Sequence, residues 1–267
     1  MTASSGSPLR SGSHAPSPPP DRRARRRGPP ARHRRSAGHW PGGTPADDPE
    51  LACIEPVPAS TSVSGVTDDG QTVELATRVL LDGVSQARAQ EVFARAADSY
   101  APLGVTLTAS YETVSFSGDD APNLIAQAKS RFGGVRPAGS DLVYVLTAKD
   151  IQADGNAAVA GLADCIGGVR FADHAFAVGE VFDEDLPIGP LTFYADATAK
   201  IAAHELGHLM GGHHHYANCA EGVKSEQEVM EGSPCTLMSN FVDFQSIHFG
   251  TVNGQIVRGH AISFASP

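Results

Sequence analysis

The segment His204–His214 constrains the fold of this chain more than any other stretch, and it reads His-Glu-Leu-Gly-His-Leu-Met-Gly-Gly-His-His. If residues 193–210 form a helix, His204 and His208 lie at positions i and i+4 on one face, where both imidazoles can bind a single metal ion. Glu205 is the next residue round the helix and lies beside that ion. Two histidines do not complete such a site, so the chain has to leave the helix and return a third ligand.

Gly211 provides that exit, because a glycine at a helix end adopts the left-handed conformation at no steric cost. Three residues later His214 can reach the ion, and by spacing we predict it as the third ligand, although His213 and His215 flank it. Three protein ligands and one water are typical of catalytic zinc, whereas structural zinc sites use four protein ligands. We therefore expect one catalytic Zn²⁺ as cofactor.

A structural role for these histidines is the alternative interpretation. The short pattern H-E-x-x-H arises by chance in many helices. The additional Gly211 and His214 favour the metal site over this alternative.

The extended pattern H-E-x-x-H-x-x-G-x-x-H, followed by Cys235-Thr236-Leu237-Met238-Ser239-Asn240, resembles the metzincin clan of zinc endopeptidases. The resemblance implies that Met238 forms an apolar floor beneath the ligand imidazoles. It also implies a twisted five-stranded sheet packed on the zinc-binding helix, with a small irregular part after Gly211.

Within the clan, the chain most resembles the reprolysin or ADAM-like branch over residues 70–267. Asp141–Thr147 is similar to that branch's central strand, and Gly161–Cys165 to its substrate-binding edge strand, here Gly161, Leu162 and Ala163. The chain differs at His215, where reprolysins usually carry aspartate. Asn240 stands where other branches place a metal-binding tyrosine, so we expect water as the remaining ligand.

These residues together predict a zinc-dependent endopeptidase acting on protein or peptide substrates. Glu205 would be the general base that takes a proton from the attacking water. An extended peptide could add to the edge strand, which favours cleavage within a chain. The alternative is a binding module that retains zinc without cutting its partner, although a binding module has no need of Glu205.

The pattern of the remaining segments predicts an α/β fold. Gln71–Asp82, Val105–Phe116 and Leu142–Leu146 read as strands separated by two helices, one capped by Ser85 and the other by Asp119 or Asp120. This order predicts right-handed crossovers and a mostly parallel sheet. Two shorter strands, Ala158–Ala163 and Ala175–Val181, complete the sheet, one of them as an antiparallel edge. A closing helix is expected around Ile256–Ile262.

Charge divides the chain into two parts. Nine of its 20 basic residues but only one acidic residue, Asp21, precede residue 41, so the remainder has 11 basic and 29 acidic side chains and a net charge of −18. We predict a disordered tail at 1–46, a linker or pro-segment remnant at 47–69 and the catalytic domain at 70–267. The Arg22–Arg27 cluster could contact nucleic acid or an acidic membrane surface. The enrichment in arginine and proline favours instead an uncleaved leader, a linker or a start codon placed too far upstream.

The acidic body argues against a nucleic-acid enzyme, and no stretch has the apolar length of a membrane span. Four cysteines favour an oxidising compartment if they pair, so we expect a secreted or extracytoplasmic protein, although no apolar signal-peptide core follows the arginines. Four cysteines allow three connectivities. Cys219–Cys235 with Cys53–Cys165 is favoured, because the first pair brackets the segment between His214 and Met238. Alternatively, Cys53 could bind the zinc as a thiolate, as in related pro-enzymes.

Overall fold

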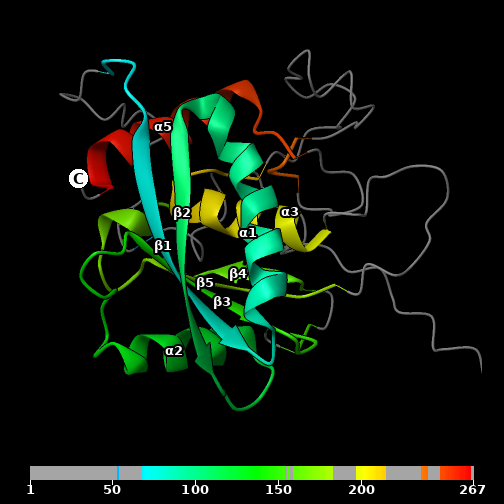
Figure 1. Ribbon diagram of the computed structural model, residues 1–267. Coiled ribbons are helices and arrows are strands. Elements are labelled where there is room, and N and C mark those ends of the chain that lie inside the picture. The colour runs from blue at the N-terminus through cyan, green and yellow to red at the C-terminus, as the bar shows by residue number, and fades with distance from the viewer. Residues whose placement is uncertain are drawn as a thin grey trace, which may run out of the picture. The chain divides into compact units, whose positions relative to one another are not determined.

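The computed structural model describes residues 53, 68–153, 155–156, 159–182, 197–214, 236–239 and 247–265. The predicted tail at 1–46 lies outside them, as does most of the predicted linker. The elements, drawn in Figure 1, are β1 (Val73–Asp82), α1 (Gln86–Tyr100), a 3₁₀ turn (Ala101–Leu103), β2 (Val105–Val114), α2 (Ala121–Arg131), β3 (Leu142–Thr147), β4 (Gly161–Ala163), a second 3₁₀ turn (Gly168–Arg170), β5 (Phe176–Glu180), α3 (Ala197–Leu209) and α5 (Thr251–Phe264).

The five strands form one sheet in the order β2-β1-β3-β5-β4. The pairs β1–β2, β1–β3 and β3–β5 are parallel, and β4 pairs antiparallel to β5, with Gly161 opposite Gly179. The predicted α/β fold, with a mostly parallel sheet and one antiparallel edge strand, is therefore confirmed. The edge strand β4 spans Gly161–Ala163 and is shorter than the predicted strand Ala158–Ala163.

Capping residues mark the starts of α1 and α2, and a glycine marks the end of the turn that follows α1. The Ser85 side chain caps α1 by accepting a hydrogen bond from the Arg88 N–H, and Asp120 caps α2 by accepting one from the Asn123 N–H. Gly104, at a φ of 65°, ends the turn after α1 and leads directly into β2. Both helices lie where the sequence predicts them.

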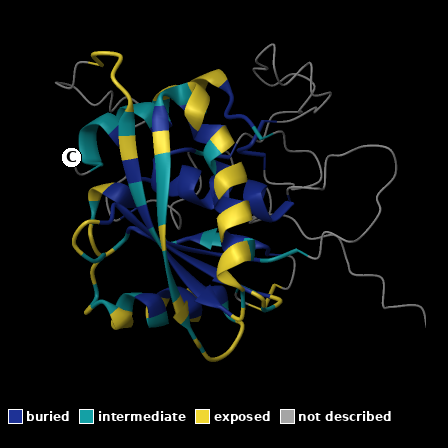
Figure 2. Cartoon of the chain, in the orientation of Figure 1, coloured by how far each residue is buried: buried dark blue, intermediate teal, exposed yellow. Residues whose placement is uncertain are grey.

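Helices cover both faces of the sheet. One core cluster joins α1, α3 and α5 to side chains of β1 and β3 such as Leu75 and Tyr144. A second cluster packs α2 against the opposite face through Val143, Val145 and Phe176. All six residues of β3 are buried, as Figure 2 shows, because this strand lies inside the sheet with helices on both sides.

Helix α3 is buried along its whole length. The Tyr100 hydroxyl, at the end of α1, donates a buried hydrogen bond of 2.9 Å to the Ala203 carbonyl. A ring contact of 5.2 Å between Tyr100 and Phe249 continues this packing to the residues that precede α5. Tyr100 therefore links α3, α1 and the segment before α5.

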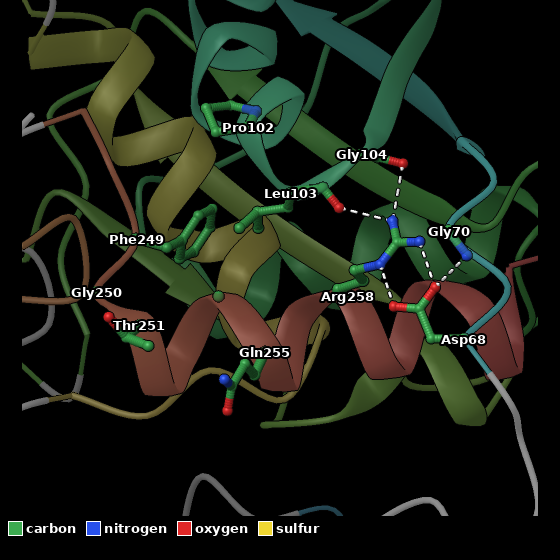
Figure 3. Close-up of a pocket in the computed structure, with 11 residues that line it drawn as sticks. Asp68, Gly70, Pro102, Leu103, Gly104, Phe249, Gly250, Thr251, Gln255 and Arg258 are labelled. Carbon is green, nitrogen blue, oxygen red and sulfur yellow. Dashed lines mark hydrogen bonds and ion pairs between the residues drawn. The ribbon is translucent and has the colours of Figure 1, made fainter. Parts of the chain in front are cut away.

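Helix α5 is the predicted closing helix, and Arg258 anchors it to the start of β1. Its guanidinium forms an ion pair with Asp68 and donates a hydrogen bond of 2.7 Å to the Leu103 carbonyl (Figure 3). The hydrogen bond from Arg258 lowers the pKa of Asp68 from 3.8 to about 2. These groups line an open pocket of about 730 Å³.

Between Gly211 and Gly250 the described residues belong to no helix or strand, which agrees with the irregular part predicted there. The helices that the structure describes are all too short or too polar to cross a membrane.

Candidate metal centre

Helix α3 places two of the predicted ligands on the same face. The His204 and His208 rings are one turn apart, with centroids 4.6 Å from each other and planes at 86°. Both side chains are buried. The i and i+4 spacing therefore has the geometrical result that the sequence predicts.

The chain leaves α3 through a Schellman motif. The Gly212 N–H donates to the Gly207 carbonyl at 2.8 Å, and the Gly211 N–H donates to the His208 carbonyl at 2.9 Å. Gly211 has a φ of 85°, and the His260 ring fills the space beside it, so that an added Cβ would lie 2.7 Å from the ring Nε2. Both its conformation and its packing therefore require glycine at this position.

After this turn, His214 faces the two histidines of the helix. Its Nε2 lies 3.0 Å from the His204 Nε2 and 3.0 Å from the His208 Nε2. The three candidate ligand atoms all lie within 4.8 Å of one another, and all three side chains are buried. Of the flanking histidines, His213 is held through its backbone N–H and carbonyl by Asn253, and His215 lies outside the described residues.

Backbone carbonyls fix the orientation of the two helix imidazoles. The His204 Nδ1 lies 2.8 Å from the Leu237 carbonyl oxygen, and the His208 Nδ1 lies 2.7 Å from the Gly212 carbonyl oxygen. Because a carbonyl oxygen only accepts hydrogen bonds, each Nδ1 carries the hydrogen and each Nε2 directs its lone pair into the centre. Burial, followed by the neighbouring His214 and His204, holds the pKa of His208 well below its usual value, so this imidazole is neutral.

This donor set fits a zinc ion. The His214 Nε2 carries at most one hydrogen and can satisfy only one of the two lone pairs that face it, whereas a cation between the three nitrogens would satisfy all of them. Nitrogen ligands at zinc distances of about 2.0–2.1 Å lie roughly 3.3 Å apart in a tetrahedral site. The observed separations of 3.0 Å are close to that value.

Met238 is buried and packs against the end of α3. Its sulfur lies 3.0 Å from the point where a Cβ of Gly207 would be, and its methyl carbon lies 3.4 Å from the corresponding point at Gly212. The preceding residue, Leu237, donates its N–H to the His248 carbonyl at 2.8 Å. The turn that carries Met238 is therefore held between α3 and the residues before α5.

The Glu205 side chain extends from α3 to the edge strand β4. A Cβ at Gly161 would lie 2.5 Å from the Glu205 Oε1 and 2.7 Å from its Cγ, so the carboxylate occupies the space that this glycine leaves. Burial raises the pKa of Glu205 to about 8, and a hydrogen bond from the Ala163 N–H opposes that rise. The structure thus brings the predicted base against the predicted substrate strand, where Leu162 lies between its two contacts.

A disulfide lies beside β4. Cys53 is bonded to Cys165, two residues after the strand, with Cα atoms 5.1 Å apart. This is one of the two pairs that the sequence favours, and it leaves Cys53 without a thiolate for the metal. The other pair, Cys219 and Cys235, lies outside the described residues.

Several residues that orient the site carry no sequence signal of that role. The carbonyls of Leu237 and Gly212 act through the backbone, and any residue type supplies a carbonyl. His260 and Asn253 contact the segment around Gly211 and His213 from α5, 40 or more residues along the chain. The pocket shown in Figure 3 is lined by none of the candidate ligands and is separate from this centre.

No protein-family model matches the chain, and no curated protein matches its sequence. Among solved structures, it is similar to the crystal structure of archaemetzincin from Methanopyrus kandleri, with 18% identity and a TM-score of 0.48, over 70% of this chain and 95% of that chain. It is also similar to the structure of myroilysin, with 14% identity and a TM-score of 0.28, over 68% of this chain and 61% of that chain. At this distance neither structure assigns a family, so the function has to follow from the site's own residues.

Proposed function

We propose that this protein is a zinc-dependent endopeptidase of the metzincin type. The observation that carries the proposal is the convergence of three buried imidazole nitrogens beside a buried glutamate that contacts an edge strand. A purely structural zinc site would use a fourth protein ligand and would not need the carboxylate.

His204, His208 and His214 would hold the ion through their Nε2 atoms. Zinc bound by three neutral ligands supplies Lewis acidity, which polarises a carbonyl and lowers the pKa of water towards about 7. The hydrogen bonds to the Leu237 and Gly212 carbonyls keep both helix imidazoles directed at the centre. The two rings therefore do not have to reorient when the substrate binds.

Glu205 would act as the general base. Glu205 follows the ligand His204 in the sequence, and its carboxylate accepts a hydrogen bond from the Ala163 N–H of β4. The carboxylate would therefore lie between the metal ligands and the substrate strand. It would accept a proton from the attacking water and deliver that proton to the nitrogen of the departing amine. A positively charged ion nearby favours the ionised carboxylate that this role needs, against the effect of burial.

The strand β4 would bind the substrate. Within the described residues it pairs with β5 alone and forms one edge of the sheet. An extended peptide can add to such an edge through its main chain, which holds a peptide bond beside Glu205 without requiring a chain terminus. This supports an endopeptidase, and the sequence resemblance supports a place near the reprolysin branch of the clan.

The exchange Glu205→Gln tests the proposal. Glutamine keeps the volume of the side chain but is not a base, so we expect full zinc content and a loss of at least about 10²-fold in kcat/KM on a quenched-peptide library. Metal content is measured by mass spectrometry on the same preparation. Wild-type activity in this variant would contradict the role of Glu205.

His208→Ala and chelation test the metal. The variant should lose zinc, and a chelator should abolish wild-type cleavage until zinc is added back. A wild type that binds one zinc per chain and cleaves no peptide would instead support the binding module that retains the ion without catalysis.

We also infer that the protein works in an oxidising compartment, because the Cys53–Cys165 disulfide is stable there and is rare in the cytosol. Alkylation of the native protein before and after reduction tests this. Labelling of Cys53 without reduction would contradict it.

A further inference from the structure

The side chain of Asn253, in the first turn of α5, binds the backbone of the residue that precedes the third histidine. Its Oδ1 accepts a hydrogen bond of 3.1 Å from the His213 N–H, and its Nδ2 donates one of 2.9 Å to the His213 carbonyl. Both contacts are partly buried and join residues 40 positions apart. One amide side chain thus satisfies both backbone groups of a single residue.

These two bonds determine where His214 lies. The carbonyl of His213 belongs to the planar peptide unit that also contains the Cα of His214, so fixing this carbonyl fixes the origin of the third imidazole. Gly212, the residue before, is fixed by the His208 ring at its carbonyl and by the Gly207 carbonyl at its N–H. Each residue between α3 and His214 is therefore fixed by backbone hydrogen bonds, and those of the last one, His213, come from Asn253.

Asn253 is itself on a firmly packed element. Gly254 is in close contact with Leu103, since an added Cβ would lie 2.9 Å from the Leu103 Cδ2. Phe249 packs on Tyr100 and beside Gly207. The His248 carbonyl binds the Leu237 N–H, while the Leu237 carbonyl lies against the His204 ring. His248, just before α5, and Asn253, in its first turn, consequently support two of the three imidazoles from outside the helix that carries the motif.

We propose that Asn253 is a positioning residue that sets the affinity of the three-histidine centre for zinc, an inference that rests on the proposed metal site. Its hydrogen bonds go to the backbone of His213 and not to the ligand rings or Glu205, so it acts through that backbone. Residues that orient metal ligands from the outside typically change metal affinity by about 10- to 100-fold when they are replaced.

Two variants of Asn253 remove one or both of these hydrogen bonds. Asn253→Ala removes both of them. Asn253→Asp keeps the volume and the acceptor for the His213 N–H, but an ionised carboxylate cannot donate to the His213 carbonyl and places an oxygen against it. We expect both variants to bind zinc about 10- to 100-fold more weakly than the wild type in competition with a calibrated chelator.

Arg258→Ala is the matched control. Arg258 lies on the same helix and anchors it through Asp68 and Leu103, but it has no contact with His213. We expect this variant to lose thermal stability in the zinc-free form while its zinc affinity stays within about threefold of the wild type. The visible absorption of the cobalt(II)-loaded protein should change for Asn253→Asp and stay unchanged for Arg258→Ala.

The inference is overturned if both Asn253 variants bind zinc within twofold of the wild type. It is also overturned if Arg258→Ala weakens zinc binding as much as they do at an equal loss of stability, because the effect would then be general loosening of α5. A wild type that binds no zinc would overturn the proposed function and this inference with it.

Discussion

Two glycines face each other across β4 and β5, and two neighbouring side chains fill the space that the missing Cβ atoms leave. Gly161 pairs with Gly179 in the antiparallel register. The Glu205 carboxylate lies where a Cβ of Gly161 would be, and the buried Tyr144 hydroxyl lies where a Cβ of Gly179 would be. Because side chains directly opposite in an antiparallel pair project from the same face, Glu205 and Tyr144 are neighbours beneath the edge of the sheet.

Gly161→Ala should displace the proposed base without unfolding the protein. The backbone of Gly161 is not in the left-handed region, and the atoms that meet the new methyl group belong to a flexible side chain. A shift of about 1 Å in a catalytic group can cost about 10²-fold in rate, so we expect a loss of that order in kcat/KM with unchanged zinc content.

Val114→Ala is the control for this exchange, since Val114 is partly buried, packs with the cluster on the opposite face of the sheet and lies on β2, at the far edge from β4. It should leave the Glu205 carboxylate in place. If Gly161→Ala were as active as the wild type, the position of Glu205 against β4 would not matter for the reaction.

Some residues of this site are recognisable from local sequence spacing, and others only from contacts between distant parts of the chain. The spacing of His204, His208 and His214 is local, and a helix with a glycine exit converts it directly into convergence. The need for glycine at position 161 and the role of Asn253 depend on contacts with residues about 40 positions away. No local pattern encodes such contacts, so the sequence predicts the ligands but not what holds them.

At the scale of elements, the end of α3 is the critical feature. The helix, its Schellman motif and the path to His214 form one unit in which Gly211 bears two constraints, a φ of 85° and contact with the His260 ring. Gly139 has a similar φ of 76°, but an added Cβ there would meet no atom within 4 Å. The two glycines therefore separate the conformational cost of a side chain from its steric cost.

Gly139→Ala should destabilise the protein by about 1–2 kcal/mol, the cost of an L-residue in the left-handed region. Gly211→Ala should cost more than this and should also weaken zinc binding, because the His260 ring or the turn has to move. Urea denaturation of both zinc-free variants and chelator competition measure the two effects. Equal stability losses with unchanged zinc affinity would show that the His260 contact is unimportant.

Caps and periodicity predicted most of the elements. Ser85 and Asp120 mark the starts of α1 and α2, and the apolar run beginning at Leu142 is the buried strand β3. The predicted edge strand, from Ala158, is too long, because apolar residues such as Val159 and Ala160 precede the first residue of β4, Gly161. In the structure the residues paired with β5 are Gly161–Ala163, with one further hydrogen bond to the Ala160 carbonyl, and strand pairing is a property of the folded sheet.

At the scale of the whole molecule, the Cys53–Cys165 disulfide closes a loop between residues 112 positions apart. It encloses β1, α1, β2, α2, β3 and β4, and it ends beside the proposed substrate strand. A covalent link over a loop of this length restricts the unfolded chain much more than the folded one.

The double variant Cys53→Ser/Cys165→Ser should lower the free energy of unfolding by about 2–5 kcal/mol. Reduction of the wild type under mild conditions should give the same loss, as measured by urea denaturation with and without a dithiol. A double variant as stable as the oxidised wild type would contradict a stabilising role for the bond.

The same bond has a consequence for any proteolytic maturation of the chain. Cleavage of the polypeptide between Cys53 and Asp68 would yield two fragments that stay joined by the Cys53–Cys165 disulfide. The upstream fragment would remain bonded to Cys165, next to the edge strand β4. Such a nicked molecule would migrate as one band on a non-reducing gel and as two bands after reduction. Cleavage of the backbone between Cys53 and β1 would therefore not by itself release the peptide that contains Cys53 from the domain.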